Sequence, residues 1–214
     1  MKENIQYWLF DLDNTLYPAA SGLFDAINQR INRYLQKFYG IHPEGADEVR
    51  RGYFHRYGLT LLGLMQERGA DPDHYLEYVH RVPVADYLSP NSRLQALLAA
   101  IPVPKAIFTN GSRRHSMAVM EALGVSGAFD EIFDIASCGY IPKPDIRSYR
   151  MVLERLGIEG HETLLAEDLE RNLPPAKSLG MVTVLVGAKG GPQSADYSVA
   201  SIEELSGFLS EIHP

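Results

Sequence analysis

Cysteine and positive charge are both scarce in this sequence of 214 residues. Its single cysteine, Cys138, excludes an intrachain disulfide and a cysteine-rich metal framework. The 20 lysine and arginine residues are outnumbered by 27 aspartate and glutamate residues, which gives a formal net charge of -7. A chain with this balance has no general attraction for nucleic acid, so we expect no nucleic-acid polymer among its partners. A small anionic ligand would need a local cation, either a metal ion or a well-placed lysine or arginine.

Long hydrophobic runs are also absent. The first apolar segment, Tyr7 to Phe10, stops at Asp11 and is far too short for a secretion signal or a membrane-spanning helix. We therefore expect no membrane partner and, with one cysteine, a location in the reducing cytoplasm. The hydrophobic fraction of 45% and the charged fraction of 22% are typical of a globular chain that buries a full core. The assembly is left open between a monomer and a homodimer.

Short apolar runs with β-branched or aromatic residues predict buried parallel strands. They lie at Tyr7 to Phe10, Lys105 to Phe108, Ile132 to Ile135, Leu164 to Ala166 and Val182 to Val186. Between them, apolar residues three and four positions apart predict helices that end at Gly124, Gly157 and Gly180. The alternation predicts an α/β fold with a three-layer, Rossmann-like parallel sheet core. Gly187 to Pro192, with three glycines, is expected to form a surface loop.

Residues 18–88 break this alternation. They contain two helical patterns without a strand-like run between them, Phe24 to Leu35 and Leu61 to Met65. We therefore predict an α-helical insertion at 18–88 and a Rossmann-like core formed by 1–17 and 89–214. The basic and aromatic segment Arg50 to Tyr57 is interpreted mainly as a solvated helix face, with stacking on a ligand ring as the alternative.

Two aspartates follow the first predicted strand, in the segment Asp11-Leu12-Asp13-Asn14-Thr15. Ligands of open α/β sheets bind outside the carboxyl ends of the strands, and alternate residues of an extended chain face the same side. Asp11 and Asp13 are therefore expected to reach one bound group. A calcium-binding loop is excluded by Leu16 at its sixth position and Gly22 at its twelfth. Taken alone, the segment is equally compatible with an ordinary surface loop.

Three further polar groups follow later predicted strands. Thr109-Asn110-Gly111 offers a hydroxyl and a glycine-containing backbone for hydrogen bonds to phosphoryl oxygens. Lys143 stands between two prolines that stiffen the backbone around one cation. Glu167-Asp168 offers the hard oxygen ligands that magnesium prefers, and Asn172 follows four residues later. Each group alone has an ordinary explanation as a turn, a solvated charge or a helix cap, but all of them in this order favour a site.

In this order the groups resemble the motifs of the haloacid dehalogenase-like superfamily, over nearly the whole chain. The insertion at 18–88 is similar to the helical cap domain of that family, so the resemblance implies that 1–17 and 89–214 form the catalytic core. The segments Phe10 to Pro18, Tyr57 to Leu61 and Arg171 to Lys177 are more narrowly similar to pyrimidine 5′-nucleotidases. The resemblance implies a phosphomonoester hydrolase that acts on a nucleoside 5′-monophosphate or another small phosphometabolite. It implies Mg²⁺ as the cofactor, held by Asp11, the main-chain carbonyl of Asp13, and Asp168. Many relatives have a shorter residue in place of Glu167, so we expect this side chain to alter the outer metal shell.

The resemblance also implies roles for the remaining residues. Asp11 would attack phosphorus and form an aspartyl-phosphate, and an ordinary aspartate pKa of about 3.9 would leave it ionised at neutral pH. Asp13 would give a proton to the leaving alkoxide and later take one from water. Thr109 and Lys143 complete the catalytic group as a phosphoryl hydrogen-bond donor and a neutralising cation. The substrate-binding residues would then be Asn110, Gly111 and Asn172.

Three alternatives to a phosphatase are considered, and the sequence favours them to different degrees. A phosphosugar mutase of the same superfamily would use the same aspartate pair. A non-catalytic binding protein could retain the fold, although it would have no need to keep every expected group. A haloacid dehalogenase is disfavoured because Asp13 is present, whereas displacement of a halide needs no acid for the leaving group.

Overall fold

The computed structural model describes residues 5–187 and 195–212. The chain divides into two compact units. The core unit comprises Met1–Ala20 and Leu88–Pro214, and the helical unit comprises Ser21–Tyr87. These limits lie within a few residues of the predicted core and cap, while the function of the helical unit as a cap stays a prediction.

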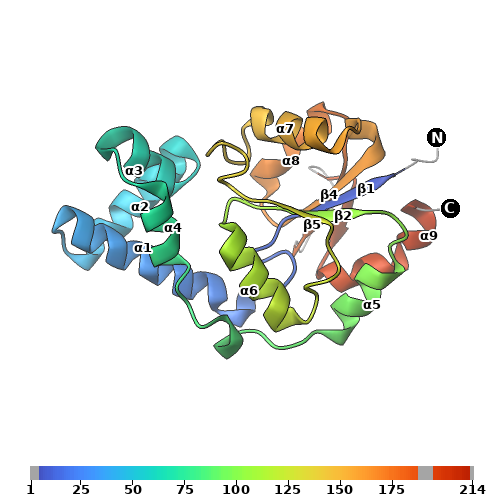
Figure 1. Cartoon of the computed structure of the whole chain (residues 1–214), viewed down its shortest axis with the longest axis horizontal. Coiled ribbons are helices and arrows are strands. Elements are labelled where there is room, and N and C mark those ends of the chain that lie inside the picture. Colours follow the sequence, from blue (N-terminus) through green and yellow to red (C-terminus); the bar gives the residue numbers. More distant parts are fainter. Residues whose placement is uncertain (1–4, 188–194, 213–214) are drawn as a thin grey trace. The chain divides into compact units, whose positions relative to one another are not determined.

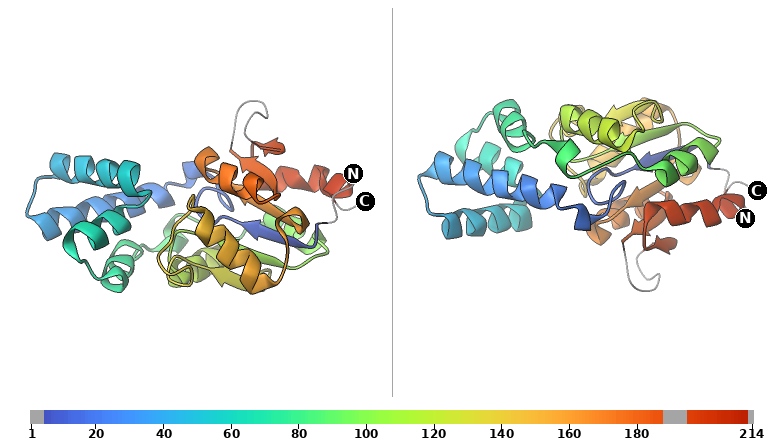
Figure 2. Two further views of the ribbon diagram at one scale, coloured as in Figure 1. Left: turned by 90° about the horizontal axis from the view of Figure 1, so that it is seen from above. Right: turned by 90° about the horizontal axis from the view of Figure 1, so that it is seen from below.

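The core unit is built on a parallel sheet in the strand order β3-β2-β1-β4-β5-β6. The strands are β1 (Tyr7–Phe10), β2 (Lys105–Phe108), β3 (Glu131–Phe133), β4 (Thr163–Glu167), β5 (Val182–Val186) and β6 (Tyr197–Val199). Every neighbouring pair runs parallel. Helices α7 and α8 cover one face, and α5 and α6 cover the other, as the views from above and below show (Figures 1 and 2). The predicted three-layer, Rossmann-like α/β fold is therefore confirmed.

Helices of the core begin and end where the sequence supplies caps. The α-helices are α5 (Ser92–Ala100), α6 (Arg113–Leu123), α7 (Ile146–Leu156), α8 (Leu173–Ser178) and α9 (Leu209–Ile212). Short 3₁₀ turns are η1 (Ala19–Ser21), η3 (Gly160–Glu162), η4 (Glu170–Asn172) and η5 (Ile202–Gly207). The side chain of Ser112 accepts a backbone hydrogen bond at the start of α6, and that of Asp145 does so at the start of α7. Gly124 and Gly157 end these two helices with positive φ, as predicted.

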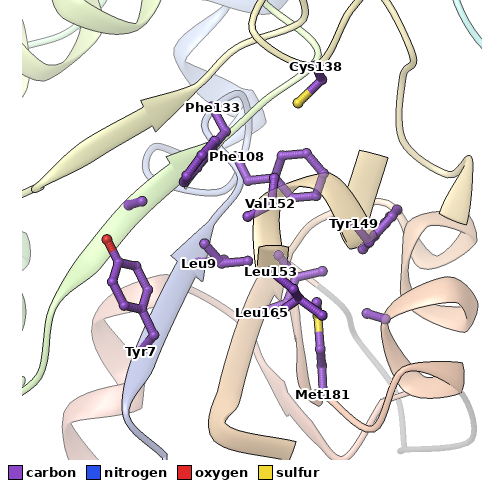
Figure 3. Close-up of a cluster of buried hydrophobic side chains, with 12 residues drawn as sticks. Tyr7, Leu9, Phe108, Phe133, Cys138, Tyr149, Val152, Leu153, Leu165 and Met181 are labelled. Atoms are coloured by element: carbon purple, nitrogen blue, oxygen red, sulfur yellow. The ribbon is translucent and has the colours of Figure 1, made fainter. Parts of the chain in front are cut away.

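A hydrophobic cluster joins the sheet to the face covered by α7 and α8 (Figure 3). Tyr7 and Leu9 of β1 point to this face together with Leu165 of β4, and they meet Tyr149 and Val152 of α7. The intervening residues of β1, Trp8 and Phe10, are also fully buried and stack on one another. Burial on both faces is expected for a central parallel strand and explains why β1 contains no charged residue.

The helical unit contains α1 (Leu23–Tyr39), α2 (Pro43–Tyr57), α3 (Thr60–Arg68), α4 (Pro72–Val79) and the 3₁₀ turn η2 (Val84–Asp86). Leu23, Ile27 and Leu35 are buried along α1, whereas Phe24, expected in this stripe, is 37% exposed. The ring of Tyr53 packs directly on α3 because residue 63 is glycine: a Cβ there would lie 2.3 Å from the ring.

The segment from Arg50 to Tyr57 forms most of α2 and is largely engaged within the helical unit. Arg50 bonds to Asp47, and both Arg56 and Tyr57 bond to Glu67. The exposed arginines on this helix agree with a solvated face.

Three strand predictions differ from the structure. Strand β4, Thr163–Glu167, is one residue longer at each end than the predicted run from Leu164 to Ala166. Strand β3 is Glu131–Phe133 rather than Ile132 to Ile135, because Asp134 leaves the ladder and accepts the backbone N–H groups of Arg113 and Ser137, both at 2.9 Å. Strand β6 was not predicted, since Tyr197–Val199 is a short edge strand without an apolar run. Of the predicted loop from Gly187 to Pro192, only Gly187 lies within the described residues. Among the described residues, no helix combines the length and the apolar character needed to span a bilayer.

Candidate active site

The candidate site lies at the carboxyl ends of β1, β2 and β4, where the order of the strands reverses. From β1, the chain adds β2 and β3 on one side of the sheet and β4 and β5 on the other. Asp11 continues the ladder beyond β1 by donating its N–H to Ala166 at 2.9 Å, and Thr109 does the same beyond β2 with Phe133 at 2.9 Å. A reversal of strand order opens a crevice outside the carboxyl ends, where ligands of such sheets bind.

Lys143 is the cation at the centre of this site. Its Nζ donates to Asp11 Oδ1 at 2.8 Å, to Glu167 Oε2 at 2.7 Å and to the carbonyl oxygen of Phe108 at 2.7 Å. The side chain is only 1% exposed, so all three ammonium hydrogens are used inside the protein. The neighbouring carboxylates raise the pKa of Lys143 despite its burial, which keeps the ammonium charged.

Asn110 fixes the backbone at Lys143. Its Nδ2 donates to the carbonyl oxygen of Lys143 at 3.0 Å, and its Oδ1 accepts the Lys143 N–H at 2.8 Å. The Gly111 N–H donates to Thr109 Oγ1 at 3.0 Å. The Asn110 side chain and the Gly111 amide, both predicted to bind substrate, are thus engaged in shaping the loop. Because Thr109 Oγ1 accepts the hydrogen bond from Gly111, its own hydroxyl hydrogen can be donated to an oxygen of a ligand.

The carboxyl group of Asp11 is held at both oxygens and nearly buried. Thr15 Oγ1 donates to Oδ2 at 3.0 Å, opposite the Lys143 contact at Oδ1. Burial, with Glu167 adding to it, raises the pKa of Asp11 to about 7, although Lys143 works in the opposite direction. The expectation of an ordinary aspartate pKa is therefore wrong for the metal-free protein. An added positive charge is needed to keep Asp11 fully ionised at neutral pH.

A group of three carboxylates can hold such a charge. Oxygens of Asp11, Glu167 and Asp168 lie within 4.8 Å of one another. Burial and the neighbouring Asp11 raise the pKa of Asp168 to about 8, a sign of negative charge in excess of what Lys143 neutralises. Oxygen donors with surplus negative charge fit a hard divalent cation. The predicted ligands Asp11 and Asp168 thus lie together, while the predicted contribution of the Asp13 carbonyl stays a prediction.

Glu167 belongs to this group of carboxylates, and its effect on the outer metal shell stays a prediction. It is fully buried, and its Oε2 pairs with Lys143 while its Oε1 accepts the Leu169 N–H at 3.1 Å. Its side chain therefore reaches the same lysine as Asp11 does.

The side chain of Asp13 turns toward two residues that were not predicted to belong to the site. Tyr17 OH donates to Asp13 Oδ1 at 2.5 Å, and His115 Nε2 lies 2.7 Å from the same oxygen. Burial and Asp13 together raise the pKa of the Tyr17 hydroxyl, so it remains a donor. His115 stands in the first turn of the helix that follows Thr109-Asn110-Gly111, and this spacing is the one signal in the sequence that points to it.

Within the described part of the chain, the Asn172 side chain makes no hydrogen bond to the other predicted site residues. It ends η4 and precedes α8, whereas it was predicted in the first turn of the following helix. Its carbonyl oxygen accepts the Tyr149 hydroxyl at 2.6 Å. Its buried Oδ1 has no hydrogen-bond partner among the described residues, so this atom is available to a ligand.

The site combines the carboxylate of Asp11, which can act as a nucleophile, with the buried Lys143 and a second aspartate, Asp13. It lies where the strand order of the parallel sheet reverses, and this combination is typical of a hydrolase. Comparison with known proteins gives the same class. Residues 5–180 match the family model of the haloacid dehalogenase-like hydrolases, and the chain belongs to this family.

Similar proteins include enzymes named as phosphatases. Phosphate metabolism protein 8 of Saccharomyces cerevisiae is 26% identical over 196 residues, which cover 83% of this chain but only 60% of the yeast protein. Glyceraldehyde 3-phosphate phosphatase of Methanocaldococcus jannaschii is 25% identical over 222 residues, with 95% of this chain and 96% of the archaeal protein covered. The crystal structure of a HAD phosphatase from Thermococcus onnurineus has a TM-score of 0.64 at 21% identity and covers 97% of this chain and 99% of its own. This last similarity supports the fold.

Proposed function

We propose that the protein is a Mg²⁺-dependent phosphomonoester hydrolase that acts through an aspartyl-phosphate on Asp11. The observation that supports this most strongly is the contact of 2.8 Å between Lys143 Nζ and Asp11 Oδ1 inside a group of carboxylates that fits a divalent cation. A purely structural ion pair would need only one carboxylate. The raised pKa values of Asp11 and Asp168 indicate that the additional acids leave negative charge in excess of the single charge of Lys143.

Each residue of the site has a separate role in the proposed reaction. One carboxylate oxygen of Asp11 bonds to phosphorus as the bond from phosphorus to the leaving oxygen breaks. Asp13 protonates that oxygen, and Thr109 donates to a phosphoryl oxygen. Lys143 holds Asp11 in place and offsets negative charge in the transition state. Water then attacks phosphorus, gives a proton back to Asp13, and releases inorganic phosphate and the free Asp11 carboxylate.

Asp11 and Asp168 would hold the metal ion, with the main-chain carbonyl of Asp13 as a further ligand. When bound, Mg²⁺ supplies positive charge that reduces the repulsion between Asp11 and an anionic phosphoryl group. The pKa values of Asp11 and Asp168, raised to about 7 and about 8, support this role because both carboxylates lack sufficient cationic partners.

A small phosphometabolite is the proposed substrate class, with nucleoside 5′-monophosphates first. The motif segments similar to pyrimidine 5′-nucleotidases support a nucleotide. The relative named as a glyceraldehyde 3-phosphate phosphatase instead supports a small phosphorylated sugar or acid. Residues 18–88 are proposed to act as a cap that excludes water and contacts the leaving group. The cytoplasm remains the proposed location, on the basis of the single buried cysteine, Cys138. The proposed assembly is a monomer or a homodimer.

A phosphosugar mutase is the second candidate function, because it would use the same two aspartates and the same buried lysine. The two activities differ in their products. A mutase converts a hexose 1-phosphate into its isomer without net release of phosphate, whereas a hydrolase releases inorganic phosphate. A non-catalytic binding protein is the third candidate, and it would release none from any ester.

Phosphate release from p-nitrophenyl phosphate, with MgCl₂ and with EDTA, tests the proposed function. Wild type should be active only with Mg²⁺, and Asp11→Asn should lose the activity. A panel of nucleoside monophosphates, sugar phosphates and phosphoglycolate then ranks the substrates. Wild type without Mg²⁺-dependent phosphate release from any ester would overturn the proposal, as would an Asp11→Asn variant with full activity.

A further inference from the structure

Two residues other than glycine have a positive φ in the part of the chain that the structure describes, and both lie in loops that carry site residues. Asn14, with φ of 62°, directly follows Asp13. Tyr140, with φ of 58°, stands three residues before Lys143. Asparagine adopts this left-handed conformation at little cost, because its short polar side chain bonds locally. An aromatic residue has no such compensation, so the residue type does not explain the conformation of Tyr140.

The loop that carries Tyr140 is tied to the candidate site at both ends. Near its start, the Ile135 N–H donates to the carbonyl oxygen of Gly111 at 3.1 Å, and the Tyr140 N–H donates to the carbonyl oxygen of Ile135 at 2.9 Å. At its end, the Lys143 N–H donates to Asn110 Oδ1 at 2.8 Å. Three residues span at most about 11 Å, so the Cα atom of Tyr140 lies within that distance of the Cα atom of Lys143. These bonds link Tyr140 through one residue to Gly111, in the loop proposed to receive the phosphoryl group.

The chain keeps an aromatic residue where glycine would adopt the same backbone conformation without a steric penalty. Backbone conformations that cost free energy persist mainly where a functional site uses them. Tyr140 is half-buried, so part of it is accessible to a ligand. We propose that Tyr140 is a specificity-determining residue whose ring contacts a planar ring in the leaving group, such as the base of a nucleoside 5′-monophosphate. This inference rests on the proposed function.

Stacking on the leaving group has a kinetic signature of its own. An aromatic side chain stacks on any nucleic-acid base, because every base presents a π-face. The contact involves the part of the substrate beyond the phosphoryl group, so it stabilises the bound substrate and the transition state alike. Loss of such a contact raises KM and leaves kcat nearly unchanged. Inorganic phosphate carries no leaving group, so its binding should not depend on Tyr140.

Four substitutions separate the ring from the backbone conformation. Tyr140→Phe keeps the ring. Tyr140→Gly and Tyr140→Ala both remove it, but only alanine keeps a Cβ atom in the left-handed conformation. Gly139→Ala is the matched control, because Gly139 has φ of 62° and a Cβ atom there would meet no atom within 4 Å. This control adds the backbone penalty at the neighbouring residue and leaves the ring in place.

We would measure kcat and KM with Mg²⁺ for the ring-bearing ester that wild type hydrolyses fastest, and the inhibition constant of inorganic phosphate. Base stacking on an aromatic side chain is strong enough that KM should rise about tenfold in Tyr140→Gly and Tyr140→Ala, with kcat within about threefold of wild type. Tyr140→Phe and Gly139→Ala should keep KM within about threefold of wild type, since both retain the ring. The inhibition constant of phosphate should also change less than about threefold in all four variants.

Urea denaturation checks the backbone argument separately. Tyr140→Gly should unfold at a higher urea concentration than Tyr140→Ala, because only the alanine variant retains the steric penalty. Glycine fits the backbone conformation, so Tyr140→Gly tests the role of the ring even where Tyr140→Ala does not fold.

Four results would overturn the inference while phosphate release by wild type keeps the proposed function. They are an unchanged KM in Tyr140→Gly, an equal rise of KM in Gly139→Ala, equal urea midpoints for the glycine and alanine variants of Tyr140, and a wild type that prefers esters without a ring. A wild type that releases phosphate from no ester would overturn the proposed function and this inference with it.

Discussion

Lys143 and Glu167 form an ion pair with 2.7 Å between Nζ and Oε2, and the side chain of each is 1% exposed. The lysine also pairs with Asp11, so one ammonium group compensates two buried carboxylates. Removing one partner of a buried ion pair leaves an uncompensated charge in a medium that solvates it poorly. The arrangement therefore ties the stability of the core unit to the same lysine that is proposed to serve catalysis.

Lys143→Met should cost about 3–5 kcal/mol of unfolding free energy because it leaves Asp11 and Glu167 without their cation. Glu167→Gln should cost much less, since Lys143 keeps Asp11 and the amide oxygen can still accept its hydrogen bond. Urea denaturation of both variants and of wild type at neutral pH, in EDTA, gives the two values. Equal costs for the two substitutions would contradict the account of this ion pair.

The pH dependence of stability should have an unusual sign above about pH 5. Asp11 and Asp168 have pKa values of about 7 and about 8 in the folded protein. Both lie above the value of about 4 in an unfolded chain. Between these values the folded protein binds more protons than the unfolded chain, so its free energy of unfolding falls as pH rises from about 5 to about 8. Thermal unfolding in EDTA across this range checks the slope, and Asp168→Asn should flatten it. A metal-free stability that increases with pH would rule the explanation out.

Mg²⁺ should reverse this loss. A cation binds the deprotonated carboxylates, so the increase in Tm caused by MgCl₂ should be larger at about pH 8 than at about pH 6. The same measurement on Asp11→Asn and on Asp168→Asn should give a smaller increase, because each variant removes a proposed ligand. A Tm shift of the same size in wild type and in both variants would place the ion elsewhere.

Substitution by alanine should lower mainly the stability at Asn110 and mainly the activity at Asn172. Asn110 bonds twice to the backbone of Lys143, so Asn110→Ala should lower the free energy of unfolding by about 1–3 kcal/mol. Asn172 Oδ1 is buried without a hydrogen-bond partner among the described residues, so Asn172→Ala should cost less than about 1 kcal/mol. Phosphate release should nevertheless fall in Asn172→Ala if this oxygen serves a ligand. Denaturation and activity measured on the same preparations compare the two effects, and an Asn172→Ala variant with full activity would make its oxygen dispensable.

Close packing at Gly160 offers a test of the fold that is independent of chemistry. A Cβ at Gly160 would lie 1.8 Å from the carbonyl oxygen of Leu179, so the backbone must shift in Gly160→Ala. We expect a loss of about 1–3 kcal/mol. Gly127→Ala is the matched control, because a Cβ there meets no atom within 4 Å. Comparable stability of the two variants in urea would contradict the packing between η3 and the end of α8.

The sheet was predictable from the sequence wherever its strands are central. The predicted runs Tyr7–Phe10, Lys105–Phe108 and Val182–Val186 match strands of the structure without change, because strands buried on both faces are mostly apolar. The polar exceptions are Lys105 at the start of β2 and Thr183 inside β5. The edge strand at Tyr197–Val199 is partly exposed and has no such run. In the helical unit, only the second half of α2 was predicted, as the solvated helix face from Arg50 to Tyr57. Its first half was missed because α2 has no regular apolar stripe, and several of its polar residues bond to Asp47 and Glu67 instead.

The sequence predicts which polar residues of the site lie at strand ends, but it does not predict their contacts or their pKa values. Asp11 and Thr109 come directly after β1 and β2, and Glu167 is the last residue of β4. The structure brings them to one edge of the sheet together with Lys143. The contacts of His115 and Tyr17 with Asp13 depend on helix rotation and side-chain torsion, which local spacing does not fix. The pKa of Asp11 likewise depends on burial and on Glu167, so the ordinary value assumed from residue type was wrong.

Chemical trapping of the intermediate is the most direct test of the nucleophile. Enzyme mixed with a phosphate ester and Mg²⁺, quenched in acid and reduced with borohydride, converts an aspartyl-phosphate into homoserine, which peptide mass spectrometry locates. The account predicts homoserine at position 11 in wild type, and none in the absence of substrate or in Asp11→Asn. Homoserine at another position, or none at all in enzyme that demonstrably releases phosphate, would contradict the assignment of Asp11 as the nucleophile.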